Sequence, residues 1–298
     1  MKEEVEVWFK SFQDNLCNAL ETCDGGTVFK EDTWQKDPGE GGGRTRIIQN
    51  GQVLEKGGVL FSAVTGSLPT AAAKALLLPD TNFFATGVSV VLHPQSPMVP
   101  IIHMNVRYFE AGNGEAWFGG GIDLTPIYVN PEQAAFFHQS LKNTCDQHNL
   151  AYYPEFKKWA DDYFYITHRQ ETRGIGGIFF DRLQATPDIT LAQRFSFVQA
   201  VANTFAPVYT QIMNENRNLP YNPDQKQWQL LRRGRYVEFN LALDRGTRFG
   251  LETGGRTESI LMSLPAQAAW EYNYTPEPGS AEAQTLQYLK KDINWTNN

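Results

Sequence analysis

The sequence predicts an α+β fold: a single domain over residues 1–298, with a large, mainly antiparallel β-sheet covered by α-helices on both faces. Two observations predict it. The hydrophobic pattern has a period of two between residues 87 and 124, and a helical period before and after that stretch. Strands and helices also do not alternate regularly, as they would in a parallel α/β sheet. A chain of 298 residues can bury a large core without disulfides.

The part of the chain before the central strands predicts two helices and a hairpin. Apolar residues recur at spacings of three and four from Val5 to Cys23, as on one face of an amphipathic helix. The pair Asn50-Gly51 is a typical hairpin turn between two strands. These elements are expected at residues 5–23, 44–48 with 52–64, and 71–78.

The central strands have the clearest alternation. From residue 87 and again from residue 102, every second residue is apolar and the residues between them are mostly polar. The short connection predicts that these two strands are antiparallel neighbours. Asn113-Gly114 then predicts a turn into a third strand at residues 115–124.

Helices dominate the second half of the chain. Asn130 followed by Pro131 predicts a helix start, because Asn caps a helix well and Pro fits its first position. The alternation returns at residues 236–244, which we expect to be a strand. The elements expected after residue 124 are helices at 130–148, 154–164, 188–212 and 281–290, and strands at 176–183, 236–244 and 259–264.

Composition and charge exclude several classes of protein. The formal net charge of -7 disfavours nucleic acid as a partner, and three cysteines without a CxxC motif argue against a disulfide scaffold. No apolar stretch reaches the roughly 18 residues of a membrane span. The first ten residues carry three Glu and no Arg, unlike a targeting segment, so we expect a cytoplasmic protein.

Motifs for bound redox cofactors are also missing from the sequence. There is no GxGxxG motif between a strand and a helix and no CxxCH motif, so we expect no flavin, nicotinamide or heme. Any redox chemistry would then use oxygen, a metal or the electrons of the substrate.

One face of the central strands has the composition of a ligand site. It carries Ser89, His93, His103, Asn105 and Arg107, whereas the opposite face is apolar. Lys and Glu, which are typical of solvated faces, are absent from this row. We therefore expect a cleft that accepts a ligand; the alternative is a solvated outer face.

An arginine-rich segment suits recognition of anions. Six arginines and three acidic residues between Arg232 and Arg256 leave a local charge of +3, and a guanidinium matches a carboxylate. Gly254 and Gly255 let backbone N–H groups approach an anion. Asp123 follows three glycines, which leave room beside a large ligand. The alternatives are surface arginines paired with nearby acids and a glycine-rich bend of the sheet.

The histidines could hold a divalent metal, although their spacing matches no zinc template. Imidazoles from two strands and two helices would have to come together. The alternatives are a hydrogen-bonded core residue for His138, and a favourable charge at a helix end for His148 and His168.

Long blocks of the chain resemble the oxygen-dependent coproporphyrinogen III oxidases, from about residue 8 to residue 272. The blocks are His103–Tyr108, Trp117–Pro126, Lys157–Phe164, Arg173–Asp181 and Gly254–Pro265. The resemblance implies oxidative decarboxylation of the ring A and B propionates of coproporphyrinogen III to vinyl groups. The co-substrate would be O2 and the product protoporphyrinogen IX, in heme or chlorophyll synthesis. It also implies a homodimer formed through residues 236–272.

The resemblance further implies roles for single residues. His103 resembles a proton donor, while Asp123 and Asp244 resemble acids that hold pyrrole N–H groups and assist proton removal. The implied substrate contacts are Ser89, Asn105, Val106, Arg107, Gly254, Gly255 and Arg256. The metal ligands of some members match His93, His103, His138 and His168.

Two other functions fit the same residues. One is a metal-dependent oxygenase that uses the four histidines. The other is a tetrapyrrole carrier without activity, in which the arginines and the 13% of aromatic residues would serve binding alone.

Overall fold

One antiparallel sheet organises the molecule. The computed structural model describes residues 1–68, 70–75, 81–252 and 254–296. In this part of the chain, seven strands pair in the order β1-β2-β3-β4-β5-β6-β9, and the short strands β7 and β8 pair separately. The strands are β1 Lys30–Gln35, β2 Gly41–Gln49, β3 Leu54–Ser67, β4 Asn82–Pro94, β5 Ile101–Ala111, β6 Ala116–Thr125, β7 Tyr165–Ile166, β8 Glu171–Thr172 and β9 Gly177–Gln184.

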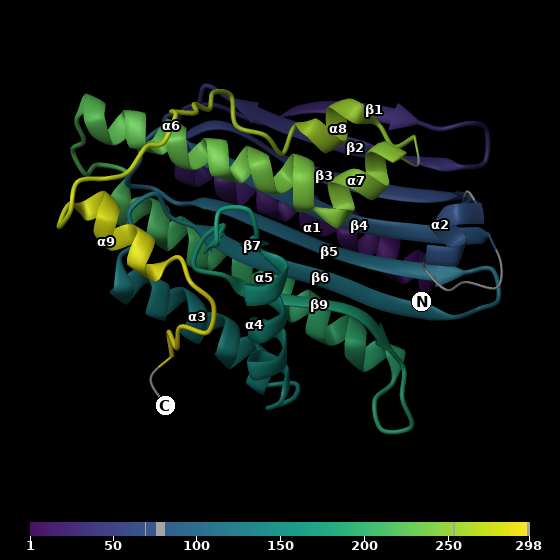
Figure 1. Ribbon diagram of the computed structural model, residues 1–298. Helices are drawn as coiled ribbons and strands as arrows, with labels where there is room; N and C mark the ends of the chain where they lie inside the picture. Colours follow the sequence, from purple (N-terminus) through teal and green to yellow (C-terminus); the bar gives the residue numbers. More distant parts are fainter. Residues whose placement is uncertain (69, 76–80, 253, 297–298) are drawn as a thin grey trace.

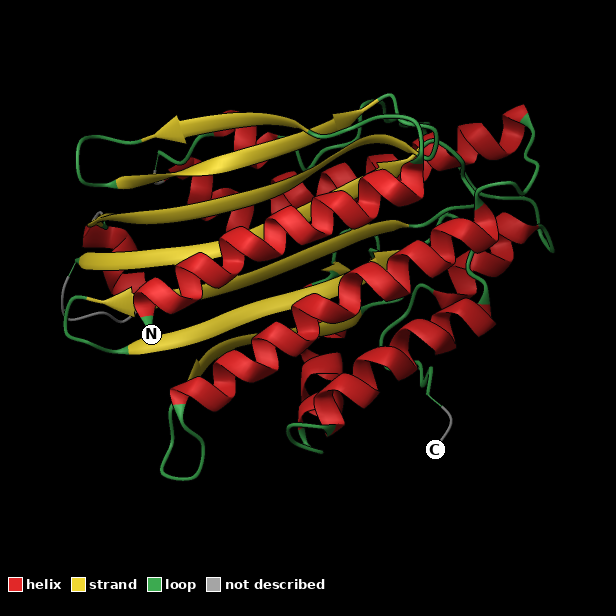
Figure 2. Ribbon diagram, turned by 180° about the vertical axis from the view of Figure 1, so that it is seen from behind, coloured by secondary structure: helices red, strands yellow, loops and turns green. Residues whose placement is uncertain are grey.

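Helices cover both faces of this sheet, which confirms the predicted α+β architecture. Figure 1 shows α6, α7 and α8 along one face, and Figure 2 shows α1 and α5 along the other. The helices are α1 Lys2–Asp24, α2 Thr70–Ala75, α3 Pro131–Asp146, α4 Tyr152–Tyr163, α5 Leu191–Asn216, α6 Pro223–Glu238, α7 Arg245–Glu252, α8 Thr257–Leu261 and α9 Ala281–Tyr288, with a π-helical turn η1 at Phe239–Leu243. Among the described residues, no helix is both long and apolar enough to span a membrane.

The two faces of the sheet differ as the alternation predicts. Val88 on β4 and Met104 and Val106 on β5 are fully buried in the large core beneath α1 and α5. The residues between them, such as Ser89 and Asn105, are only half-buried. We call the side of Val88 the apolar face and the side of Asn105 the polar face.

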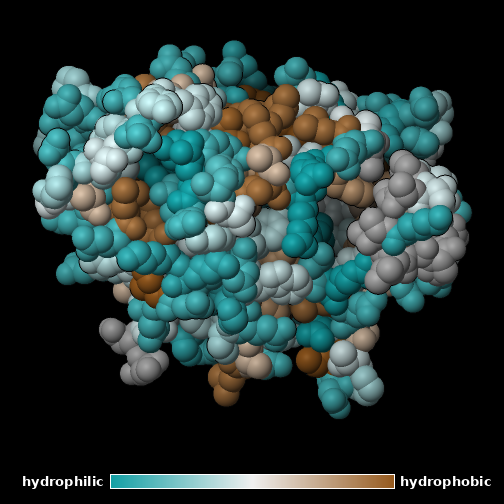
Figure 3. Space-filling model, viewed as in Figure 1, coloured by the Kyte–Doolittle hydropathy of each residue, from teal (hydrophilic) through white to brown (hydrophobic). Residues whose placement is uncertain are grey.

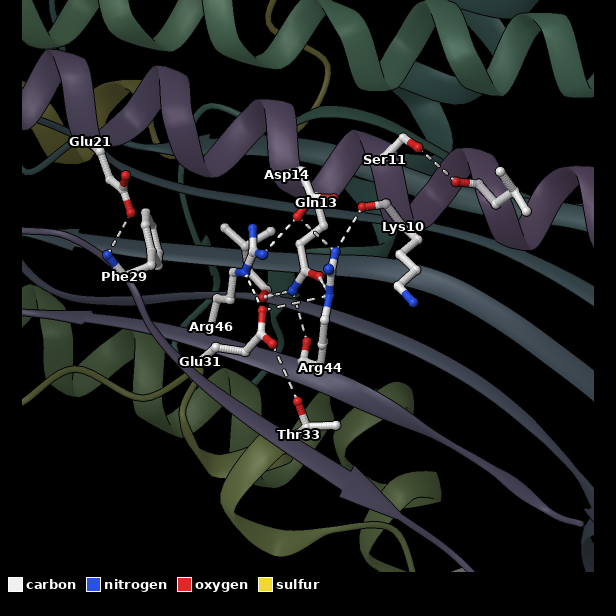
Figure 4. Close-up of polar contacts among 12 residues, drawn as sticks. Lys10, Ser11, Gln13, Asp14, Glu21, Phe29, Glu31, Thr33, Arg44 and Arg46 are labelled. Atoms are coloured by element: carbon white, nitrogen blue, oxygen red, sulfur yellow. Dashed lines mark hydrogen bonds and ion pairs between the residues drawn. The ribbon is translucent and has the colours of Figure 1, made fainter.

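Polar contacts tie α1 to the first two strands (Figure 4). Gln13 is fully buried on α1, and its Nε2 donates a hydrogen bond to the carbonyl oxygen of Arg44 at 2.8 Å. Arg44 and Arg46 of β2 both pair with Asp14, at 2.9 and 2.7 Å. Arg46 also reaches Glu31 on β1 at 2.9 Å. The edge of the sheet is therefore anchored by a partly exposed polar network around the buried Gln13 on its apolar face.

The prediction of two strands in the C-terminal third of the chain is wrong. Residues 236–243 form the end of α6 and the turn η1, and residues 259–261 form the end of α8. Tyr236, Phe239 and Asn240 are the buried side chains there, at a helical spacing of three and four. The start signal of α6 was present in the sequence, because Asn222 and Gln225 form a capping box before the helix.

Other boundaries also differ from the expectation. The strand β1 was not among the predicted elements, and β2 begins at Gly41 rather than at residue 44. α5 begins after Thr190, which forms a capping box with Gln193, rather than at residue 188. The expected helix at 71–78 corresponds to α2, and residues 76–78 lie outside the described part of the chain.

Candidate active site

The antiparallel register brings the predicted site residues together on the polar face. Ser89 of β4 is the cross-strand partner of Asn105 on β5. His103 pairs with Asp123 of β6. Directly opposed residues have side chains within contact distance of each other, so the register alone assembles this cluster.

A stretch of the polar face lacks side chains around Arg107. Its cross-strand partners are Gly87 on β4 and Gly119 on β6. The same row continues through Ser62 to Gly43, against which the ring of Trp34 lies. A large flat ligand can therefore approach the strands closely around Gly87, beside the Arg107 guanidinium, which lies over Gly119.

A buried ion pair lies at the centre of the polar face. The side chain of Asp123 is 1% exposed, and its two oxygens accept hydrogen bonds from Arg173 Nη2 at 2.7 and 2.9 Å. Asp123 Oδ1 also lies 2.8 Å from His103 Nδ1. Burial alone would raise the pKa of Asp123, but Arg173 and His103 outweigh it and hold that pKa below its ordinary value. Asp123 is therefore an ionised group that orients His103.

Arg173 is the functional residue that the sequence analysis did not assign. Its guanidinium is 4.5–4.7 Å from the rings of Phe164, Tyr236 and Phe239, and its Nη1 donates a hydrogen bond to Asn240 at 2.9 Å. Three aromatic faces and one carboxylate balance a cation that is almost fully buried. Two signals were present in the sequence: Arg173 comes directly before a glycine-rich, apolar strand, and it begins the block Arg173–Asp181, which resembles the oxygen-dependent coproporphyrinogen III oxidases.

Asp244 acts as a helix cap. Its Oδ2 accepts hydrogen bonds from the backbone N–H and the hydroxyl of Thr247 at 2.8 and 2.7 Å, in the first turn of α7. Its Oδ1 accepts one from the hydroxyl of Tyr163 at 2.7 Å. Burial would raise the pKa of Asp244, but these hydrogen bonds lower it overall. Both of its oxygens are therefore occupied within the protein.

Arg256 lies at the other end of the polar face. It precedes α8, and its Nη2 is 2.5 Å from Asp32 on the edge strand β1. Gly254 has a φ of 73°, which favours glycine, and the N–H of Gly255 is bonded to the carbonyl of Gly250 at 2.7 Å. The guanidinium is thus on the predicted face, whereas the Gly255 N–H already has a partner.

Val106 and most of the clustered arginines have side chains that are already engaged within the protein. Val106 points into the core and is fully buried, so only its backbone lies beside the row of Asn105 and Arg107. Five of the six clustered arginines pair with acids. Besides Arg256 with Asp32, the pairs are Arg232 with Glu171 at 2.8 Å, Arg233 with Glu55 at 2.5 Å, Arg235 with Glu238 at 3.2 Å and Arg248 with Glu252 at 3.9 Å.

Two of the candidate metal ligands are neutral core residues. His93 is fully buried, and its Nε2 is 2.8 Å from the carbonyl oxygen of Ser263. His138 bonds Tyr153 at Nδ1 and the carbonyl of Ile175 at Nε2. Burial lowers the pKa of each histidine to about 3.

The four candidate histidines do not fit a shared metal site. His168 is half-exposed and lies 2.9 Å from Glu238, while His103 contacts Asp123. None of the four shares a polar partner with another. No group of three His, Cys, Asp or Glu in the described chain is arranged to hold a metal ion.

Comparisons with known proteins identify the family of the chain. The sequence model of the coproporphyrinogen III oxidase family matches residues 4–295. An oxygen-dependent coproporphyrinogen-III oxidase of Drosophila melanogaster is 48% identical over 309 residues, which cover 99% of this chain and 78% of that protein. A chloroplastic oxygen-dependent coproporphyrinogen-III oxidase of Glycine max is 47% identical over 310 residues, covering 99% of this chain and 80% of that protein. The chain therefore belongs to the coproporphyrinogen III oxidase family.

Proposed function

We infer that this chain catalyses the oxygen-dependent decarboxylation of coproporphyrinogen III to protoporphyrinogen IX. Each of the ring A and B propionates loses CO2 and becomes a vinyl group, while O2 accepts two electrons and two protons to give hydrogen peroxide. The observation that carries this inference is the polar face itself. It combines a row of small residues, two arginines and an oriented histidine.

The arginines suit the acid arms of the substrate. Arg107 and Arg256 lie on the same face of the sheet, near its β9 and β1 sides respectively. Each presents a planar fork that matches a carboxylate. Ser89 and Asn105 lie beside Arg107 and can hydrogen bond to the macrocycle or its arms. The protein thus binds a molecule with several carboxylates in spite of a net charge of -7.

His103 is the group that we propose moves protons. Asp123 fixes its Nδ1, so the opposite ring nitrogen, Nε2, is directed away from this ion pair. The half-buried His103 side chain is still open to a ligand on the polar face. Asp123 and Asp244 then act through other groups: Asp123 orients His103, and Asp244 holds the start of α7 over the sheet.

We propose O2 as a co-substrate that reacts with the electron-rich tetrapyrrole itself. The four histidines do not fit a shared metal site among the described residues, so the proposed mechanism does not use a metal. The contribution of the protein is then to hold the reacting propionate arm and the proton-transferring His103 in a fixed arrangement. Such positioning supplies a large part of the rate in many enzymes.

We also propose that the chain forms a homodimer through residues 236–272. Exposed apolar side chains cluster in this segment: Leu241, Phe249, Leu251, Trp270 and Tyr272, the last of them 97% exposed. Figure 3 shows hydrophobic residues gathered over α7 and α8. Contiguous apolar surface of this kind is typical of an interface.

The dimer is tested by light scattering on the full chain. We expect Leu251→Glu to shift the mass toward that of a monomer, because it places a charge in the apolar surface. Leu150→Glu changes a more exposed leucine outside the segment and should leave the mass unchanged. A monomeric wild-type protein would contradict the proposal.

An assay with coproporphyrinogen III in the presence and absence of O2 tests the activity. Release of CO2 and peroxide only with O2 is expected. Binding without turnover would instead identify a carrier. Loss of activity on exhaustive chelation, with recovery on adding a divalent metal, would identify a metal-dependent oxygenase.

A further inference from the structure

Arg107 is held from two sides on the polar face. Its Nη1 donates a hydrogen bond to Asn105 Oδ1 at 2.8 Å. Its Nη2 lies 2.9 Å from Asp181 Oδ1 on the edge strand β9. Because β6 lies between β5 and β9, the guanidinium reaches across a whole strand to meet this carboxylate.

That reach depends on Gly119, the partner of Arg107 in the β5–β6 ladder. A Cβ at position 119 would lie 2.4 Å from Asp181 Oδ1 and 2.7 Å from Arg107 Nη2. Gly119 does not have a positive φ, so its backbone would tolerate alanine. Glycine is therefore required here for the space it leaves between the two charged side chains.

Asp181 faces the polar side of the sheet and is followed directly by a β-bulge on β9. Gly119 on β6 faces two residues of β9, Asp181 and Arg182, instead of one. Phe180 and Leu183 on either side both point into the core, and Arg182 adopts a φ of 52°. The extra residue thus keeps both core side chains buried while Asp181 faces Arg107. Its left-handed backbone is unfavourable for a residue with a Cβ.

Stability does not account for these features. The side chains of Arg107 and Asp181 are 35% and 34% exposed, and Asp181 Oδ1 is a buried atom that accepts no hydrogen bond from the described residues, so this ion pair adds little to folding. A glycine inside a strand and a left-handed arginine both oppose folding. Unfavourable backbone that is kept at a ligand-binding face points to a role in function.

We propose that Asp181 is a positioning residue that fixes the direction of the Arg107 guanidinium toward a carboxylate arm of the substrate. This inference rests on the proposed function. Asn105 and Asp181 engage Nη1 and Nη2, which leaves the other N–H donors of Arg107 for a propionate. Asp181 also partly offsets the positive charge of Arg107. Removing the charge of Asp181 therefore allows the Arg107 guanidinium to change its direction. The same change strengthens the attraction of Arg107 for anions.

These two effects separate kcat from KM. We expect Asp181→Asn to lower kcat on the order of tenfold, because small misplacement of a binding group is costly. KM should stay unchanged or fall. Asp181→Glu, which restores the charge, should recover part of kcat. Asp188→Asn changes an exposed acid in the loop after the same strand and should leave both constants unchanged.

The proposal that Asp181 acts through Arg107 is tested by making the Asp181→Asn substitution in the Arg107→Lys variant as well. In Arg107→Lys, adding Asp181→Asn should change kcat less than twofold, because coupled residues are not additive. Gly119→Ala should reproduce the loss of kcat. Gly66→Ala on β3 is the control, since its Cβ would meet no atom within 3.7 Å. Melting temperatures of all variants separate loss of folded protein from loss of turnover.

Two results would overturn the proposal. One is an unchanged kcat in folded Asp181→Asn. The other is a full tenfold effect in the Arg107→Lys background, which would mean that Asp181 touches the substrate itself. If wild-type protein and Asp188→Asn both fail to turn over coproporphyrinogen III under O2, the proposed function fails first and this inference falls with it.

Discussion

Replacing Asp123 with asparagine leaves the Arg173 guanidinium buried without its counter-charge. The side chains of Arg173 and Asp123 are 3% and 1% exposed, and two hydrogen bonds of 2.7 and 2.9 Å join them. Asparagine has nearly the same shape as aspartate, so the substitution removes a charge without opening a cavity. The measured effect therefore reports on electrostatics.

The expected loss of stability is about 3–5 kcal/mol at pH 7, which is the usual cost of removing one partner of a buried ion pair. This is a large part of the total stability of a domain, about 5–15 kcal/mol. The three aromatic rings around Arg173 remain in place and still stabilise the cation. We therefore expect a value near the lower end of that range.

The pH dependence of this loss has a defined sign. The pKa of Asp123 is lower in the folded protein than its ordinary value, about 3.9, in the unfolded chain. Its contribution is thus fully present above about pH 4 and is lost as the pH falls through the folded pKa. The variant lacks this group. The difference in free energy of unfolding between the wild type and Asp123→Asn should be constant from pH 7 to about pH 4. It should become smaller at lower pH.

Urea unfolding followed by tryptophan fluorescence measures this difference at each pH. The double variant Asp123→Asn/Arg173→Met is the control. It should be more stable than Asp123→Asn alone, because no buried charge is left without a partner. A loss below about 1 kcal/mol at pH 7, or a difference that stays constant down to pH 3, would refute the reasoning.

Three further predictions concern other parts of the molecule. Arg256→Ala should raise KM on the order of tenfold or more, as expected for a lost charge-assisted hydrogen bond; an unchanged KM would remove Arg256 from the site. Asp244→Ala should lower the free energy of unfolding by about 1 kcal/mol or more, because Thr247 loses its cap; Asp244→Asn should restore part of it, and equal stability of all three proteins would contradict the cap. Iodoacetamide at pH 8 should not modify Cys17 or Cys145 in the folded protein, because burial raises the pKa of each thiol to about 12; peptide mapping that finds either labelled would contradict this.

The sequence was most informative where one face of a strand is buried. Residues 87–124 alternate because one face packs under α1 and α5, so both the strands and their polar face could be predicted. Residues 236–244 also alternate, but there the pattern coincides with a helix whose buried side chains are three and four residues apart. A short apolar stretch fits both periods, and only its tertiary contacts decide between them.

The site was predictable within the sheet and less so beyond it. Register follows from alternation, so His103, Asn105 and Arg107 could be placed on one face. The partners of a charged residue depend on chain segments that are distant in sequence, such as Arg173 for Asp123 across 50 positions. For the same reason, the sequence could not show that the four candidate metal ligands among the histidines each have their own partners. The cytoplasmic location stays a prediction.

The contact between Arg256 and Asp32 joins segments that are 224 positions apart in the sequence. Protein synthesis starts at the N-terminus, so the first strand has left the ribosome long before the segment that carries Arg256. Contacts between such distant residues also form slowly. A nascent chain that stops short of residue 256 contains all the strands of the sheet, but it cannot form the contact between Arg256 and Asp32 on β1. With the proposed role of Arg256, competence to bind the substrate is acquired late in synthesis, after most of the fold exists.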